Sequence, residues 1–532
     1  MVGLTVFDWA IFVAYFGILA VSGWYFSRKK VTNTNDYFLG GNNMPVWLVA
    51  ISVLATAQSA ATFLGGPDQG YRADLSYLAT NIGAIIAAIF VSIYMIPKFY
   101  QYKVSTVYEL LEVRFGETAK KQAGIMYLFG RVFSSGARLY MASIAVSMIL
   151  FSDIKADHVV LAIILLTTIG LMYSFFGGIK AVIYSDAIQC LVYVSAAIAV
   201  IYYLLTSIPA DLGQIIDALN NPIGGGKSKF TLFNFDLDFT SQGVFTVWAS
   251  FTGFVLMNIA AFGMDQDMTQ RVLTCKSAAE SSKAMLLSML LVVPVVLLFL
   301  VIGLLLYIFY QRPDLMGIPQ IGEITQTFSG EKITIFMHYV LNEMPAGLRG
   351  LVTVGIIAAA LSTLNSGLNS MSSVVIQDLY RPWRNKKGVR KTEQHFVYAG
   401  RMGMLVAAIA LGSTAILSFY WQRYTDMPLL AFALSVMVFS YSGLLGVYFN
   451  ALFTKRGNSS SVLVALIAGF LTTLFFQPYV QDSLNLTWYS YDLAFPYQLC
   501  IATSVAFVCC FMGKARTGED HTGVISFAIE TS

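Results

Sequence analysis

Long apolar segments recur along the whole chain, and they set its fold class. Hydrophobic residues make up 57% of the sequence and charged residues only 12%, with a mean hydropathy of +0.68. A helix satisfies its own backbone hydrogen bonds in lipid, and about 20 apolar residues of helix cross the hydrocarbon core. The sequence therefore predicts an all-α polytopic membrane protein with about 13 transmembrane helices, at residues 7–26, 46–66, 77–97, 122–150, 159–177, 181–205, 243–264, 284–308, 346–374, 397–421, 427–454, 459–477 and 494–512.

The first apolar segment is expected to remain as a signal-anchor helix. It shows no small-residue cleavage pattern and is followed at once by Arg28, Lys29 and Lys30. Lys and Arg mark the cytoplasmic side of short loops, and alternate loops carry them here, with a dense group between Arg381 and Lys391. We therefore expect a multi-pass protein with its amino terminus outside and its carboxyl terminus in the cytoplasm.

The chain is expected to form a single transmembrane unit over residues 1–532, because no linker rich in Pro or Ser divides it. If the first span is peripheral, spans two to six and seven to eleven form two groups of five. An odd number of spans inverts the second group relative to the first. The predicted parts are the first span with its cytoplasmic loop, the first inverted repeat, the second inverted repeat, the peripheral spans and the cytoplasmic tail, at 1–45, 46–205, 243–454, 455–512 and 513–532.

Charge and residue content argue against several other classes. The net charge of +4 follows from the basic loops, so no nucleic-acid partner is expected. The five cysteines lie in or beside spans without metal spacing, and the four histidines are scattered, so the sequence does not indicate an enzyme. A G-x-x-x-x-G-K-[ST] phosphate loop is missing, which argues against an ATP-driven pump. An ion channel, or a membrane sensor built on a transporter fold, remains the alternative class, and no obligatory protein partner is evident.

Two polar stretches interrupt the apolar spans. The centre of the second span, Ala55 to Thr62, is small and polar, and such a helix can unwind where ligands satisfy the freed backbone groups. The ninth span carries a run of hydroxyls and an amide from Ser362 to Ser366. A hard cation such as sodium needs oxygen ligands, which these groups supply. Tight packing of small residues, or hydroxyls bonded back to their own helix, would explain the same pattern without an ion.

Four motifs in order resemble the sodium:solute symporter family. The most specific is Gly177 to Gln189, and it is joined by Asp36 to Gly41, by Gln270-Arg271 and by Lys455 to Asn458. Together they extend the resemblance over residues 7–512. It implies the leucine-transporter-type fold, in which two inverted five-helix repeats enclose a substrate and sodium near mid-membrane. It also implies a plasma membrane location, in particular a bacterial inner membrane.

The resemblance also implies a set of sodium ligands. The family's common site takes carbonyls from the unwound second span and the ninth span together with two ninth-span hydroxyls, which correspond here to Ala55, Gln58, Ala359, Ser362 and Thr363. Some members carry a second sodium site that uses a sixth-span Asp and further ninth-span groups. The matching residues are Asp186, Asn365 and Ser366, although a helix-to-helix hydrogen bond from Asn365 is an equally good explanation.

Arg138 is the principal substrate candidate, because it aligns with the carboxylate-binding arginine of bacterial sodium/sialic acid symporters, and its surroundings also resemble sodium/proline symporters. A buried guanidinium offers a bidentate fork for a carboxylate. It could instead pair with helix carbonyls or extend to the interface, and Arg131 competes with it but is expected to be structural. The further pocket positions implied by the resemblance are Ser59, Thr62, Asn81 and Asn258.

Residues that differ from those of the relatives at pocket positions narrow the range of expected substrates. Ala57 and Asn81 stand where sialic acid symporters have Thr and Gln, and Leu290 and Leu434 stand where sodium/galactose relatives have Lys and Gln. We therefore expect sodium-coupled symport of a small polar organic solute into the cell by alternating access, with a carboxylate-bearing substrate such as a sugar acid, organic acid or amino acid. The alternative is a neutral sugar or polyol. The expected cofactor is the sodium ion, and the expected partners are this solute, sodium and the lipid bilayer.

Overall fold

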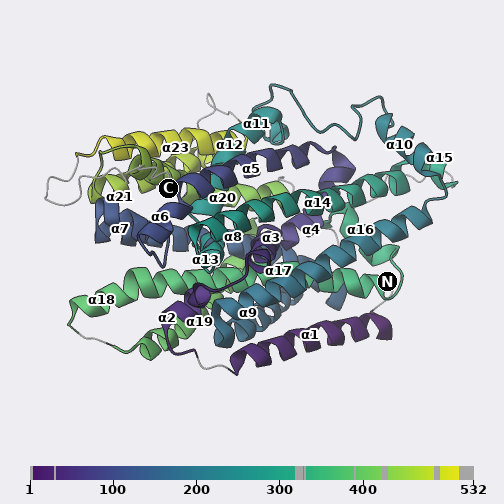
Figure 1. The fold of residues 1–532 in the computed structure, drawn as a ribbon. Helices are drawn as coiled ribbons and strands as arrows, with labels where there is room; N and C mark the ends of the chain where they lie inside the picture. The colour runs from purple at the N-terminus through teal and green to yellow at the C-terminus, as the bar shows by residue number, and fades with distance from the viewer. Residues whose placement is uncertain are drawn as a thin grey trace.

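The computed structural model is helical almost throughout, and most of its long helices run side by side (Figure 1). It describes residues 4–28, 31–317, 327–328, 331–388, 391–421, 429–484 and 492–514. Lys29, Lys30, Arg390 and the part of the predicted tail beyond Lys514 lie outside these residues. One short antiparallel pair joins strands β1 and β2, at Thr327–Phe328 and Glu331–Lys332.

The helices of the first half of the chain lead from the amino terminus to the long loop that follows α10. They are α1 Val6–Ser27, α2 Thr34–Leu39, η1 Gly40–Asn42, α3 Val46–Ala57, α4 Ala60–Arg72, α5 Ser76–Tyr94, α6 Ile96–Gln101, α7 Glu109–Phe115, α8 Glu117–Phe151, α9 Ala156–Ser207 and α10 Leu212–Asn220.

The helices of the second half complete the bundle. They are η2 Ser241–Gly243, α11 Val247–Phe251, α12 Gly253–Gly263, α13 Gln266–Val272, α14 Ala278–Gln311, α15 Pro313–Met316, α16 Ile335–Asn342, α17 Leu348–Val374, η3 Val375–Tyr380, α18 Arg381–Lys386, α19 Glu393–Trp421, α20 Leu429–Phe453, α21 Ser459–Phe475, α22 Pro478–Ser483 and α23 Phe495–Phe511.

The expected all-helical polytopic class is confirmed. Within the described residues, eight helices are long and apolar enough to cross a membrane, and up to ten if each of two bent helix pairs counts as one span. The bends measure 112° between η1 and α3 and 58° between α12 and α13. Three shorter apolar helices lie at Ala156–Met172, Ser459–Phe475 and Phe495–Phe511.

The predicted unwinding of the second span is confirmed. Helix α3 ends at Ala57, Gln58 is extended with φ −92° and ψ 115°, and α4 begins at Ala60. Ser59 caps the new helix, because its side chain accepts a hydrogen bond from the Ala61 amide. A helix end in mid-bundle leaves carbonyls of its last turn without partners of their own helix, and these carbonyls can serve a ligand.

Helix α17 forms the centre of the bundle and α1 lies at its edge (Figure 1). Nearly every residue of α17 is buried, and it packs chiefly against α9 and α8. Asp8 near the start of α1 accepts hydrogen bonds from the amides of Gly347 and Gly350 at the start of α17, at 2.8 and 2.7 Å. A carboxylate thus fixes α1 to the amino-terminal end of α17, where the helix dipole favours negative charge.

Gly178 joins two spans within α9. Its backbone has φ 59° and ψ −160°, which side chains other than glycine rarely adopt. A Cβ atom at this position would lie 2.6 Å from the Tyr37 carbonyl oxygen of α2. The sharp turn and the close approach of α2 therefore both depend on the absence of a side chain.

We expect Gly178→Ala to lower the free energy of unfolding by about 1–3 kcal/mol, because it adds backbone strain and a clash with the Tyr37 carbonyl. Thermal unfolding of the detergent-purified protein measures this change. Gly412→Ala in α19 is the control, since the nearest atoms to its Cβ lie at 3.9 and 4.0 Å, and its Tm should stay the same or rise. Equal Tm values for the two variants would contradict the strained turn.

Candidate functional site

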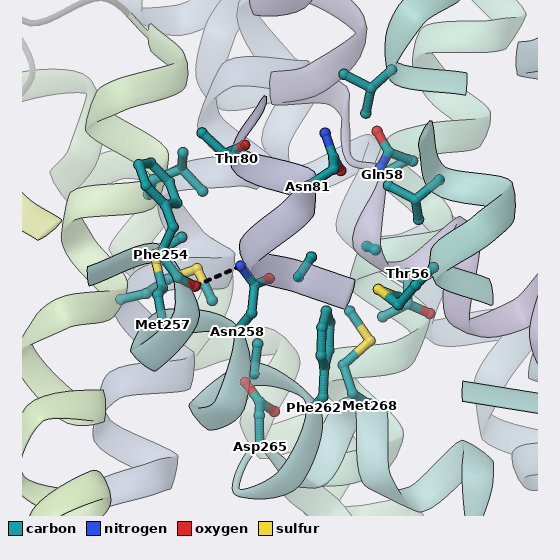
Figure 2. Close-up of a pocket in the computed structure, with 18 of the residues that line it drawn as sticks. Thr56, Gln58, Thr80, Asn81, Phe254, Met257, Asn258, Phe262, Asp265 and Met268 are labelled. Atoms are coloured by element: carbon teal, nitrogen blue, oxygen red, sulfur yellow. Dashed lines mark hydrogen bonds between the residues drawn. The ribbon is translucent and has the colours of Figure 1, made fainter. Parts of the chain in front are cut away.

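Two broken spans enclose a cavity of about 110 Å³ (Figure 2). One break separates α3 from α4, and the other separates α12 from α13 at Met264 and Asp265. Residues of α5, α8, α14 and α20 complete the wall. The wall mixes apolar and aromatic surface with a few polar groups, as small-molecule sites do. These polar groups belong to Thr56, Gln58, Tyr77, Thr80, Asn81, Arg131, Arg138, Asn258, Asp265 and Tyr441.

Three of the five predicted substrate residues line this cavity. They are Asn81, Arg138 and Asn258, whereas Ser59 and Thr62 are buried on α4 and are not among the lining residues. The Asn81 amide nitrogen donates to the Leu78 carbonyl at 3.0 Å, and that of Asn258 donates to the Phe254 carbonyl at 2.7 Å (Figure 2). The hydrogen bonds described for these two amides use their nitrogens, so their oxygens can accept from a bound solute.

Arg138 reaches the cavity from α8 without a carboxylate in contact. Its Nη2 atom donates to the thioether sulfur of Met437 at 2.9 Å, and no acidic residue among the described ones forms an ion pair with it. Thioether sulfur is a weak acceptor. The guanidinium is therefore the cationic group of the cavity that a bound anion could satisfy.

Arg131 lies two turns before Arg138 on the same face of α8, and its surroundings differ. It is 4% exposed and pairs with Asp265 at 3.1 Å and with Asp267 at a still closer contact. The Tyr441 hydroxyl donates to the same Asp265 oxygen at 2.7 Å. These contacts agree with the structural role expected for Arg131, because all of its charge is met by two carboxylates.

Asp186 lies in an ionic cluster between α9, α3, α13 and α17, which Asp267 connects to Arg131. Its Oδ1 accepts from the Ser362 hydroxyl at 2.7 Å, and its Oδ2 accepts from Ser52 at 2.5 Å and from Arg271 at 3.1 Å. Arg271 also donates to the Ser366 hydroxyl. The guanidinium therefore stands between two of the three residues predicted for a second sodium site.

The predicted ligands of the first sodium site lie on two adjoining elements, α17 and the end of α3 with its C-cap. The Ser362 hydroxyl donates a hydrogen bond to Asp186, and the Thr363 hydroxyl donates one to the Ala359 carbonyl at 3.3 Å. Both oxygens keep lone pairs that a cation can use. The end of α3, which carries Ala55 and Gln58, adjoins this part of α17, since the Thr56 and Ser366 hydroxyls lie 3.4 Å apart. The donor set of carbonyl and hydroxyl oxygens fits a hard cation.

Asn365 is buried beside these hydroxyls on α17, and its side-chain oxygen has no hydrogen-bond partner among the described residues. An orphaned oxygen deep in a protein indicates a missing partner. This atom therefore remains available to an ion or a water molecule.

Sequence reasoning missed Asp265, Asp267 and Arg271 as members of the site. Three ionisable residues within seven positions of a membrane-spanning segment are costly and usually functional, and this signal could have found them. Their pairing with Arg131 and Asp186 could not have been found, because the partners lie 134 to 136 and 85 residues away in the chain.

Helices broken in the middle of the bundle around a polar cavity, with hydroxyl-bearing residues beside it, are typical of a secondary transporter of the leucine-transporter type. A model of the sodium:solute symporter family matches residues 37–469. The chain therefore belongs to the sodium:solute symporter family, as its motifs predicted. It is a multi-pass membrane transporter and not an enzyme, and sodium is a coupled ion rather than the cofactor it was expected to be.

Individual relatives support this assignment. The chain is 27% identical over 471 residues to the sodium/sialic acid symporter SiaT of Proteus mirabilis, covering 88% of both proteins. It is 26% identical over 486 residues to the sodium/glucose cotransporter of Vibrio parahaemolyticus, covering 89% of this chain and 85% of that protein. A solved structure of a sodium-coupled sialic acid symporter in a substrate-bound outward-open state matches with a TM-score of 0.78 at 24% identity, over 96% of this chain and 99% of that one. This likeness shows the shared fold.

Proposed function

We propose that this transporter couples sodium to the uptake of a small solute that carries a carboxylate. One observation carries the proposal: Arg138 reaches the cavity and meets no carboxylate among the described residues. A guanidinium withdrawn from water is costly unless an anion compensates it. A bound carboxylate would supply two parallel hydrogen bonds in place of the thioether contact. Asn81 and Asn258 would hold the hydroxyl or amide groups of the same solute.

The transporter would sit in a bacterial inner membrane with 13 spans, its amino terminus outside and two inverted repeats at 46–205 and 243–454. The long helices, the two bent pairs and the three shorter apolar helices support this count, since they match the predicted segments. Basic residues support the orientation. Lys98 in α6 and Arg384 in α18 lie at the end of the bundle that α2 and α7 share (Figure 1), and positive charge favours the cytoplasm.

The first sodium would bind between the end of α3 and the middle of α17. Its ligands would be the carbonyl oxygens of Ala55, Gln58 and Ala359 and the hydroxyl oxygens of Ser362 and Thr363. Sodium bound there lies across the break of the second span, so it would hold α3 and α17 together while the solute occupies the adjacent cavity. By linkage, sodium that favours solute binding must itself be bound more tightly when the solute is present.

We expect Thr363→Ala to raise the sodium concentration for half-maximal uptake about tenfold, the effect of about 1.4 kcal/mol lost with one ligand. Ser362→Ala should act in the same direction. Uptake into proteoliposomes at varied sodium measures both. Thr353→Ala is the matched control, because the Thr353 hydroxyl also bonds back within α17, to the Arg349 carbonyl at 2.7 Å. An unchanged sodium requirement in both site variants would disprove the assigned site.

Asp186 would contribute to sodium coupling in one of two ways. In the first, it binds a second sodium together with Asn365 and Ser366, and the unpartnered Asn365 oxygen supports this role. In the second, it orients Ser362 for the first sodium, and the hydrogen bond of 2.7 Å between Ser362 and Asp186 supports this role. Each elementary charge that enters the cell at about 100 mV contributes about 2.3 kcal/mol, so a second sodium would support a much steeper solute gradient.

The ratio of sodium flux to solute flux in proteoliposomes separates the two roles of Asp186. If Asp186 binds a second sodium, wild type should move two sodium ions per solute, and Asp186→Asn should move one. If it orients Ser362, the ratio should be one in both proteins, and the variant should need more sodium for half-maximal uptake. A ratio of one together with an unchanged sodium requirement would leave Asp186 a purely structural residue.

The substrate can be found without a transport assay. Thermal shifts of the purified protein with sialic acids, hexoses, amino acids and short carboxylates, each in sodium and in potassium, report binding by mass action. A carboxylate that stabilises the protein only in sodium would support the proposal. A hexose or polyol that does so would favour the neutral-solute alternative, carried by Asn81, Asn258, Ser59 and Thr62.

We expect Arg138→Lys to raise the apparent KM strongly, because lysine keeps the charge but loses the bidentate fork. Arg138→Ala should weaken binding of the acid about 30-fold or more, since it removes one partner of a buried charge pair, and it should leave the sodium-induced thermal shift in place. Uptake of the acid is compared with uptake of its methyl ester. Equal transport of both by wild type, or normal transport by Arg138→Ala, would refute the carboxylate assignment.

A further inference from the structure

A continuous series of five charged side chains begins at the cavity wall and leads away from it. Arg131 of α8 pairs with Asp265 and Asp267, Arg271 pairs with Asp267 at 3.0 Å, and Arg271 also pairs with Asp186 of α9 at 3.1 Å. All five side chains are at most 4% exposed. We call this series the ionic chain. Charges buried this deeply hold their arrangement only while every partner remains in place.

Asp267 occupies the middle of the ionic chain. One of its carboxylate oxygens is bound by Arg131 and the other by Arg271, whose Nη1 atom also donates to the Asp267 backbone carbonyl at 2.6 Å. The two guanidinium groups come from different helices, α8 and α13. Without this carboxylate, Arg271 would lose its link to Arg131, and the two arginines would face each other as like charges.

The two ends of the ionic chain reach the two binding sites. At one end, Arg131 and Asp265 line the cavity. At the other end, Asp186 accepts a hydrogen bond from Ser362, a proposed sodium ligand, at 2.7 Å. Ser362 is therefore connected to the cavity wall by an unbroken series of hydrogen bonds and ion pairs, and the binding of sodium at Ser362 can affect that wall.

In the orientation proposed above, the ionic chain lies on the cytoplasmic side of the cavity. Helix α12 approaches the cavity from the external loop that follows α10, and α13 leads away from it toward Lys276 and the start of α14. In Figure 1, α13 lies toward the end of the bundle that carries α2, α6 and α7, and away from α10 and α15. An exit path toward the cytoplasm between α13 and α8 would have to break the ion pairs that join these helices.

We propose that the ionic chain is the cytoplasmic gate of this transporter and that Asp267 is the positioning residue through which sodium keeps the gate closed. This inference rests on the proposed sodium site and orientation. Sodium on the Ser362 oxygen polarises its hydroxyl and strengthens the hydrogen bond to Asp186, which holds Arg271 against Asp267 and Asp267 against Arg131. When sodium leaves, this support is lost, and α13 can separate from α8 to open the path inward.

A cysteine in the cavity wall reports whether the gate is open. Ala261→Cys places a thiol on α12, one turn before Asp265, where the native side chain lines the cavity. A membrane-impermeant maleimide added to inside-out membrane vesicles reaches this thiol only through the cytoplasmic side. Labelling is measured in sodium and in potassium, and the chain without Ala261→Cys gives the background of the five native cysteines.

We expect sodium to slow labelling of Ala261→Cys relative to potassium. Adding Asp267→Asn should speed labelling about tenfold or more in both cations, because it breaks the centre of a buried ionic chain. The double variant Arg131→Gln with Asp267→Asn keeps the net charge and should label equally fast, so the test survives if Asp267→Asn alone does not fold. Asp378→Asn is the matched control, since Asp378 is also fully buried but bonds Thr106 and takes no part in the chain.

The gate would be disproved if both Asp267 variants were labelled at the rate of the parent protein. It would also be disproved if Asp378→Asn speeded labelling as much as they do, because that would indicate general loosening of the structure. Thr363→Ala separates this inference from the sodium site, because Thr363 is no member of the ionic chain. It should need more sodium to slow labelling. If Thr363→Ala needs no more sodium than the parent protein to slow labelling, the proposed sodium site is wrong. The gate itself is tested by the labelling rate of Asp267→Asn in potassium.

Discussion

Every charge and every free backbone group inside the membrane needs a partner there, and this constraint organises the centre of the molecule. Water cannot compensate an exposed carbonyl or a lone carboxylate in a low-dielectric interior. The ionic chain from Arg131 to Asp186 is the result, because each of its carboxylates contacts at least one guanidinium. Helices α8, α9 and α13 are thereby held in one arrangement around the central helix α17.

The two broken spans obey the same constraint in a different way. The break after Ala57 exposes carbonyls that a helix would otherwise satisfy. They are tolerated because the end of α3 adjoins hydroxyl-rich α17 and a polar cavity rather than lipid. A sodium ion beside them would complete their coordination, so the local cost of interrupting a helix and the capacity to bind an ion have one structural origin.

Arg138 and Arg131 show how the surroundings separate two identical side chains on one helix. Arg131 is met by two carboxylates of α13, whereas Arg138 meets the sulfur of Met437 on α20. The first arginine therefore has its charge satisfied by the protein itself. The second keeps binding capacity, which is what a site for a transported anion requires, because a permanent carboxylate partner would compete with the solute.

The sequence by itself determined the membrane class, the helical segments, the break near Gln58, the hydroxyl run on α17 and the family, because these depend on local composition and on short motifs. Only the tertiary structure decided that Ser59 and Thr62 lie off the cavity lining, that Arg271 stands between Asp186 and Ser366, and that Asp267 joins two arginines. Such contacts unite residues up to 136 positions apart. Local pattern cannot specify them, since they depend on how helices from distant parts of the chain pack together.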